Sequence, residues 1–141
     1  MTRIGILSLL SIALVLIVPI HAAASCSQGD LAGPWQVYVF SAYNSGCWTR
    51  FNIKINQKGK VTIKSTIDSY GKQSSIVYPS GGQLTVNSAC YVTGSIVQPS
   101  EVDPISIRVD QGTLNKSKDT FGAVGFDVAT IYTCTITGFK R

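Results

Sequence analysis

The chain has 141 residues, of which 45% are hydrophobic and only 13% are charged, and its formal net charge is +5. The only histidine, His21, and the only methionine, Met1, both lie in a segment that we expect to be removed. The folded part therefore has no imidazole or thioether, which excludes haem ligation by His or Met, His-metal sites and nucleophiles activated by His.

Residues 1–24 have the organisation of a signal peptide. Arg3 precedes the apolar run "IGILSLLSIALVLIVPI", and Ala22 and Ala24 in "HAAAS" are the small residues that a signal peptidase requires. We expect cleavage after Ala24 and export to the periplasm or out of the cell. One alternative is an uncleaved transmembrane anchor, because about 20 apolar residues cross a bilayer. A second is lipidation of Cys26, which would leave the protein attached to a membrane.

All four cysteines follow this segment: Cys26, Cys47, Cys90 and Cys134. In an exported chain an even count predicts two disulfides, with three connectivities left open. No CxxC pair occurs, and oxidised cysteines offer no thiolate to a metal ion. We therefore expect neither a metal site nor a cofactor.

The expected mature chain, residues 25–141, carries eleven Lys and Arg against seven Asp and Glu, a net charge of +4. The basic residues are spread along the chain, and the densest group falls on alternate positions of expected strands. This pattern favours a solvated sheet face over a nucleic-acid surface. We expect no nucleic-acid partner and at most a weak attraction to anionic components of the cell envelope.

The mature chain forms one expected domain made of short runs rich in Val, Ile, Thr and Tyr. In chain order these runs are "WQVYVFS", "CWTRFNIKIN", "VTIKSTID", "QSSIVY", "QLTVN", "CYVTGSIV", "ISIRVDQGTLN", "TFGAVGF" and "TIYTCTITGF". Turn signals separate them at regular spacing, which is typical of an all-β sandwich or barrel. We expect nine strands, or eight if the pieces around "YPSGG" form one irregular crossing.

Alternation within the runs gives each strand one apolar and one polar face. A sequential series of such strands predicts an up-and-down (meander) β-barrel of 8–9 antiparallel strands. An immunoglobulin-like sandwich is the alternative, but Trp48 directly follows Cys47, which fits its Cys–Trp–Cys pattern badly. The residues expected inside the barrel are Trp35, Val37, Val39, Phe51, Ile53, Ile55, Val61, Ile63, Ile67, Leu84, Val86, Val92, Ile96, Ile107, Val109 and Phe121.

Two short motifs mark the ends of the mature chain. The stretch "GPW", from Gly33 to Trp35, opens the first strand, and "GFKR" ends the last. Together they resemble the two conserved ends of lipocalin and avidin-like barrels, the calycin architecture. The resemblance implies that Trp35 closes one end of the barrel beneath a basic residue of the final strand, for which we expect Arg141. The segment "DTFGAVGFD" also resembles small exported bacterial proteins of unknown function, which assigns no activity.

The opposite end of such a barrel would be open. The bulky inward residues indicate a mostly filled interior, so a binding site would be a shallow pocket at this end. Aromatic side chains with polar neighbours are typical of ligand sites. Five residues are expected around this pocket: Tyr43, Asn44, Trp48, Arg50 and Tyr70.

These features predict an exported lipocalin-like binding protein for a small apolar or aromatic molecule. We do not expect an enzyme, because the few acidic residues fall mostly in turns, where they satisfy backbone groups. Hydrolysis by paired carboxylates would need two of them to face one cleft. The alternative is a structural or interaction protein of the cell envelope, such as an inhibitor or a surface-assembly subunit, without a small-molecule site.

Overall fold

The computed structural model describes residues 25–42, 47–99, 105–128 and 131–141, and the predicted signal peptide lies outside them. Among the described residues no helix is long and apolar enough to cross a membrane. A short helix, α2 (Gln28–Leu31), precedes the strands. The strands are β1 (Gly33–Ser41), β2 (Trp48–Ile55), β3 (Val61–Asp68), β4 (Gln73–Ser74), β5 (Gly82–Val86), β6 (Tyr91–Gln98), β7 (Ile105–Leu114), β8 (Thr120–Asp127) and β9 (Tyr132–Lys140).

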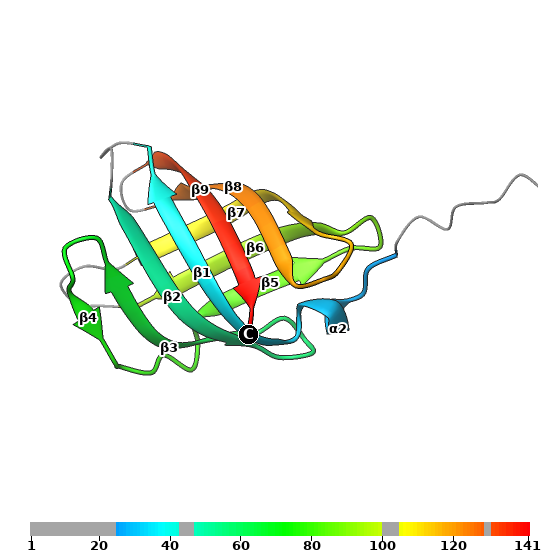
Figure 1. Ribbon diagram of the computed structural model, residues 1–141, viewed down its shortest axis with the longest axis horizontal. Helices are drawn as coiled ribbons and strands as arrows, with labels where there is room; N and C mark the ends of the chain where they lie inside the picture. The colour runs from blue at the N-terminus through cyan, green and yellow to red at the C-terminus, as the bar shows by residue number, and fades with distance from the viewer. Residues whose placement is uncertain (1–24, 43–46, 100–104, 129–130) are drawn as a thin grey trace, which may run out of the picture.

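All nine strands belong to one antiparallel sheet in the order β4-β3-β2-β1-β9-β8-β7-β6-β5. The first long strand therefore pairs directly with the last, and the other long strands follow one another as in a meander. In Figure 1, β3, β2, β1, β9 and β8 form a front wall, and β7, β6 and β5 pass behind it. The predicted all-β meander is confirmed as a strongly curled half-barrel.

The two short pieces β4 and β5 act as one irregular crossing. β4 pairs with the end of β3, Tyr78 bridges Ile63, and Gln83 in β5 bridges Lys60. The chain from β4 to β5 thus runs antiparallel to β3 along most of its length. Because β5 also pairs with β6, this segment links the two edges of the sheet at one end. If β4 and β5 are counted as one, the chain crosses the sheet eight times. Because successive crossings alternate in direction and eight is even, the last strand, β9, runs antiparallel to the first, β1.

The core consists mostly of the residues that alternation places inside, including the fully buried Trp35 and Phe121. One expectation is wrong: Ile67 lies on the outer side, opposite Arg50. The register between β2 and β3 shifts at a β-bulge, so Thr66, only 8% exposed, occupies the inward position instead. A bulge reverses the alternation beyond it because it adds one residue to one strand.

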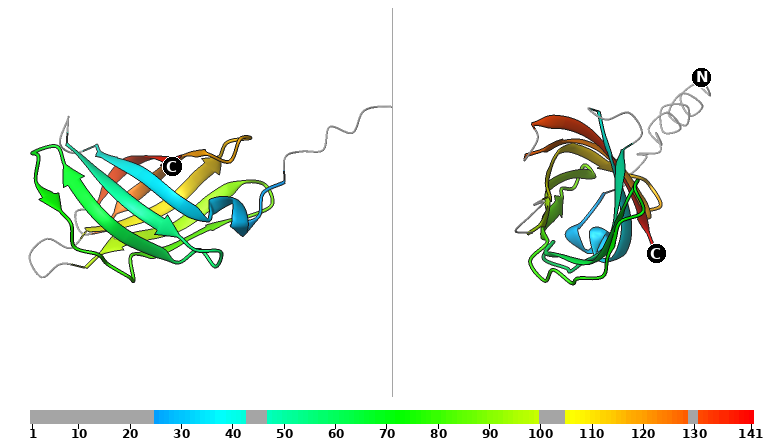
Figure 2. Two further views of the ribbon diagram at one scale, coloured as in Figure 1. Left: turned by 60° about the horizontal axis from the view of Figure 1, so that its bottom comes forward. Right: turned by 90° about the vertical axis from the view of Figure 1, so that its left-hand side faces the viewer.

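Helix α2 covers the end of the barrel at which β1 begins, which we call the closed end. Figure 2 shows it across this opening when the barrel is viewed along its length. Leu31 is fully buried there. The Gln28 side chain donates to the Leu84 carbonyl at 3.1 Å and accepts from the Val86 amide at 3.0 Å. The helix is therefore tied to β5, on the far side of the barrel from β1.

Trp35 fills the closed end, as the resemblance implied. Its indole Nε1 donates to the Leu31 carbonyl at 2.7 Å, and its ring lies 5.3 Å from that of Phe121. The cation above it is Lys140, whose Nζ lies 5.7 Å from the ring centroid and donates to the Asp30 carbonyl at 3.0 Å.

The expectation that Arg141 covers the indole is therefore wrong by one residue. Lys140 stands directly opposite Trp35 in the register of β1 and β9, so both side chains belong to the same face of the sheet. Arg141 lies beyond this pair, and its backbone amide donates to the Pro34 carbonyl at 3.0 Å.

Two glycines let these groups approach each other. Gly33 has a φ of +129°, and a Cβ there would lie 3.1 Å from Cε of Lys140. At Gly138 a Cβ would lie 2.1 Å from the Phe121 ring, which no side chain could accommodate. The glycines of "GPW" and "GFKR" thus leave room for the lysine stem and for the aromatic ring.

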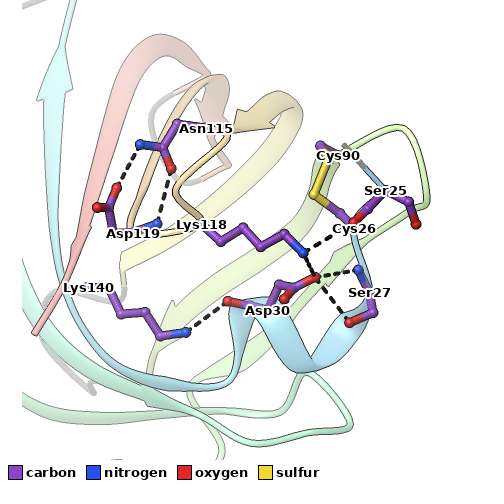
Figure 3. Close-up of polar contacts among 9 residues, drawn as sticks. All are labelled: Ser25, Cys26, Ser27, Asp30, Cys90, Asn115, Lys118, Asp119 and Lys140. Carbon is purple, nitrogen blue, oxygen red and sulfur yellow. Dashed lines mark hydrogen bonds and ion pairs between the residues drawn. A yellow bond between two sulfur atoms is a disulfide. The ribbon is translucent and has the colours of Figure 1, made fainter. Parts of the chain in front are cut away.

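The segment before α2 is held to the closed end by a disulfide, and α2 itself by an ion pair, both drawn in Figure 3. Cys26 and Cys90 form a disulfide, which joins this segment to the turn before β6. Lys118 Nζ lies 2.9 Å from Oδ2 of Asp30 and donates to the Ser25 carbonyl at 3.2 Å. The hydrogen bond from Lys118 is the main reason why the pKa of Asp30 is lowered.

Replacing Trp35 by Ala should lower the free energy of unfolding by about 3–5 kcal/mol, as for other large buried aromatic residues. Lys140→Ala should cost less, roughly 1–2 kcal/mol, because the cation is only partly desolvated. Arg141→Ala should stay within about 0.5 kcal/mol of the unsubstituted protein. Urea denaturation followed by circular dichroism measures all three. An Arg141 variant as unstable as the Lys140 variant would contradict this assignment.

Candidate functional site

A cavity of about 240 Å³ lies at the end of the half-barrel opposite α2, which we call the open-end cavity. It is formed by the ends of β1 and β2, the turn after β3, the start of β7 and the facing ends of β8 and β9. Its lining residues are Val39, Ser41, Cys47, Trp48, Thr49, Phe51, Asp68, Ser69, Tyr70, Ile105, Ile107, Asp127 and Cys134.

The lining combines apolar walls with an acidic pair. Inward residues such as Phe51 and Ile107, both buried, supply the apolar walls. Asp68 and Asp127, the last residues of β3 and β8, are the charged residues in the lining. Because the described residues of the lining include no Lys or Arg, the cavity has a negative local field that favours a neutral or cationic molecule over an anion.

The turn after β3 presents Tyr70 at the rim. Asp68 Oδ1 accepts hydrogen bonds from the backbone amides of Tyr70 at 3.0 Å and Lys72 at 2.9 Å, an arrangement typical of an Asp that stabilises a turn. The Tyr70 hydroxyl lies 3.3 Å from the Cys47 sulfur, although the tyrosine is 82% exposed. Hydrogen bonding to Cys47, followed by the negative charge of a Cys47 thiolate, raises the pKa of Tyr70.

Two of the five residues expected around the pocket border the open-end cavity: Trp48 and Tyr70. The Trp48 ring also packs against Tyr38 on the outer face, with 6.1 Å between centroids, so this tryptophan stands between the cavity and the outside. Arg50 does not border the cavity and lies on the outer face of β2. Tyr43 and Asn44 lie outside the described residues.

Asp68, Asp127, Cys47 and Cys134 all border this cavity, but none of them is among the residues expected around the pocket from the sequence. Asp68 and Asp127 each end a strand that runs toward the open end, so the strand directions alone would have placed them together. Cys134 follows from alternation in β9, where it shares the inward face with Ile136. The direction of each strand could have predicted that Asp68 and Asp127 lie at the open end, but only if the number of crossings had been known to be eight.

The expectation of two disulfides is wrong in this structure, because Cys47 and Cys134 are free thiols. They lie on either side of Ser41: Cys134 pairs with it in the register of β9, and the Ser41 amide donates to the Cys47 carbonyl. Neighbouring strands are about 4.8 Å apart, so two cysteines separated by one strand have Cα atoms roughly 9–10 Å apart. A disulfide requires less than about 7 Å.

The two thiols have different surroundings. Cys47 is partly exposed, whereas Cys134 is buried. Burial, followed by the charges of Asp127 and Asp110, raises the pKa of the Cys134 thiol from 9.0 to about 11. The stabilisation associated with this protonated thiol is present below about pH 9 and is lost as the pH rises toward 11.

Within the described part of the chain, no group of three or more His, Cys, Asp or Glu residues could hold a metal ion. The chain matches no protein-family model and no curated protein.

A thiol assay on the denatured, unreduced mature protein should find two thiols, those of Cys47 and Cys134. In the native protein at pH 8, Cys47 should react quickly and Cys134 slowly, because the second thiol is buried and protonated. Cys47→Ser should remove the fast phase, and Cys134→Ser the slow one. Finding no thiol in the denatured protein would mean that the second disulfide exists after all.

Proposed function

We propose that the protein is an exported, lipocalin-like binding protein whose open-end cavity takes a small, partly apolar or aromatic molecule. The observation that carries this proposal is the cavity itself, which lies opposite the end filled by Trp35 and is bordered by Trp48 and Tyr70. Apolar walls with a few polar groups are the usual composition of a small-molecule site.

The volume of the cavity limits the size of the ligand. At about 240 Å³ it is smaller than the roughly 300–1,000 Å³ of pockets for drug-sized molecules. It is larger than the ~150 Å³ of an apolar protein cavity that binds benzene. These limits support a molecule with one aromatic ring and a short substituent rather than a long lipid chain.

The charges at the rim select among such molecules. Asp68 and Asp127 would attract a cationic substituent and repel a carboxylate. The thiols and the hydroxyl of Ser69 add weaker hydrogen-bonding groups. The ligand class that this cavity supports best is therefore a small aromatic amine or alcohol.

Export to the periplasm or the outside of the cell is part of the proposal. The Cys26–Cys90 disulfide supports it, because such bonds persist in oxidising compartments. The predicted signal peptide and the resemblance to calycin barrels point the same way.

Three molecules of matched shape test the proposal: benzylamine, benzyl alcohol and benzoate. Replacing Trp35 by Phe leaves Trp48 as the one tryptophan of the chain. Its fluorescence should change when benzylamine or benzyl alcohol binds. We expect dissociation constants on the order of 0.1–1 mM, which correspond to roughly 4–5.5 kcal/mol. Benzoate should bind at least fivefold more weakly than benzylamine.

Thr49→Phe should block the cavity, because Thr49 lies in its lining on the inward face of β2. Its matched control, Thr133→Phe, adds the same ring to an exposed outward position of β9 and should leave binding unchanged. Failure of all three molecules to bind, or equal binding to the Thr49 variant, would contradict the proposed site.

A further inference from the structure

The outer face of the front wall carries a cluster of aromatic rings, which we call the outer platform. It consists of Tyr38 and Phe40 on β1, Trp48 on β2 and Phe139 on β9. Tyr38 is central, with centroids 6.4 Å from Phe40, 6.1 Å from Trp48 and 6.3 Å from Phe139. In Figure 1 these three strands lie side by side at the front of the barrel.

Two of the rings lie side by side along one strand. The planes of Tyr38 and Phe40 differ by only 15°, and their 6.4 Å separation matches the roughly 6.6 Å between alternate residues of a strand. Phe40 and Phe139 are 44% and 45% exposed. Exposed aromatic rings gathered in one patch mark an interaction surface more often than scattered ones do.

The same face has basic charge that no acid balances. Arg50, Lys54 and Lys64 lie on it, and none of them forms an ion pair among the described residues. The acidic residues of the wall strands are Asp68 and Asp127, which both belong to the open-end cavity. The outer platform is therefore complementary to an anion.

Arg50 stands directly beside the rings. It pairs with Tyr38 in the register of β1 and β2, and its buried Nε atom has no hydrogen-bond partner among the described residues. A buried donor without a partner is costly, so turning the Arg50 side chain outward to give this hydrogen bond to a ligand would gain free energy. A carboxylate is the group that a guanidinium binds with two parallel hydrogen bonds.

Polar side chains lie next to the rings on the same face. Gln36 donates to Asn52 at 3.4 Å, and Asn52 donates to Ser65 at 2.7 Å, which forms a row across β1, β2 and β3. On the other side, Thr135 and Thr137 of β9 stand opposite Phe40 and Tyr38. These groups can exchange hydrogen bonds with hydroxyls.

We infer that the outer platform binds an acidic polysaccharide that bears carboxylate groups. The C–H faces of sugar rings would stack on Tyr38 and Phe40, since aromatic rings present flat apolar surface with little loss of side-chain freedom. Arg50 would bind a carboxylate, and the amide and threonine groups would bind hydroxyls. Apart from Trp48, which also borders the open-end cavity, this site lies on the opposite face of the sheet, and it does not depend on the function proposed for the cavity.

Two other occupants fit these observations less well. A second copy of the chain docking by the same face would bring the unbalanced basic residues of both copies together. A lipid bilayer would bury the charge of Arg50 and the polar amide and threonine groups next to the rings in its apolar region, which is costly. The polysaccharide satisfies rings, charges and polar groups at once.

Polygalacturonate tests the inference, because its methyl-esterified form has the same backbone without the charges. Retardation of the mature protein in gels that contain either polymer should show at least fivefold tighter binding to the charged form. The double variant Phe40→Ser and Phe139→Ser should weaken binding at least fivefold. Both rings are nearly half exposed, so their loss leaves no core cavity, and circular dichroism should confirm an unchanged fold.

Matched variants distinguish binding at the outer platform from a general attraction between the basic protein and the acidic polymer. Arg50→Gln should weaken binding at least fivefold, and Arg50→Lys should restore only part of it, because an ammonium makes no bidentate contact. Lys116→Gln removes the same charge from an exposed turn at the closed end, and Val124→Ser alters an equally exposed outward residue of β8. Both controls should bind as the unsubstituted protein does.

Four results would overturn the inference. The first is the absence of binding to polygalacturonate, and the second is equal binding to its methyl ester. The third is a loss in Lys116→Gln as large as that in Arg50→Gln, which would indicate general attraction between charges. The fourth is that the rings mediate another contact, seen as sedimentation with phosphatidylglycerol vesicles or as self-association that the Phe40 and Phe139 substitutions abolish.

Discussion

The pairing of β1 with β9, in the register that places Trp35 opposite Lys140, is the constraint on which the other features of this protein depend. It joins the first long strand of the chain to the last, and the strands on either side curl around one core. At the closed end the indole is fully buried, donates to Leu31 and lies beneath the ammonium of Lys140. Since this end is filled, the remaining space in the barrel lies at the other end.

The same pairing defines two surfaces of different character. Alternation turns Val39, Phe51 and Cys134 toward the inside, where they line the open-end cavity with the carboxylates of Asp68 and Asp127. It turns Tyr38 and Arg50 outward, where they join an aromatic and basic face. The acidic residues of the wall strands border the cavity, and Arg50, Lys54 and Lys64, which form no ion pair with any described residue, lie on the outer face. A single layer of sheet therefore separates an acidic cavity on the inside from a basic face on the outside.

The closed end also connects parts of the chain that are distant in sequence. The disulfide between Cys26 and Cys90 holds the segment before α2 against one turn, and the ion pair between Lys118 and Asp30 holds α2 against another. Disulfides stabilise mainly by restricting the unfolded chain, and this one spans 64 residues. The two unpaired cysteines lie at the open end, where the intervening strand keeps them apart.

Local patterns in the sequence determined the strand content, most of the inward face and the burial of Trp35, because a period of two and regularly spaced turn residues fix which face of a strand is apolar. They also predicted that Trp48 and Tyr70 would border the open end. Contacts between distant strands decided the rest. The bulge opposite Asn52 turned Ile67 outward, the register of β1 and β9 chose Lys140 over Arg141, and one intervening strand left Cys47 and Cys134 unpaired. None of these could be read from the sequence, because register and spacing depend on which strands become neighbours, and that is settled only when the sheet closes around its core.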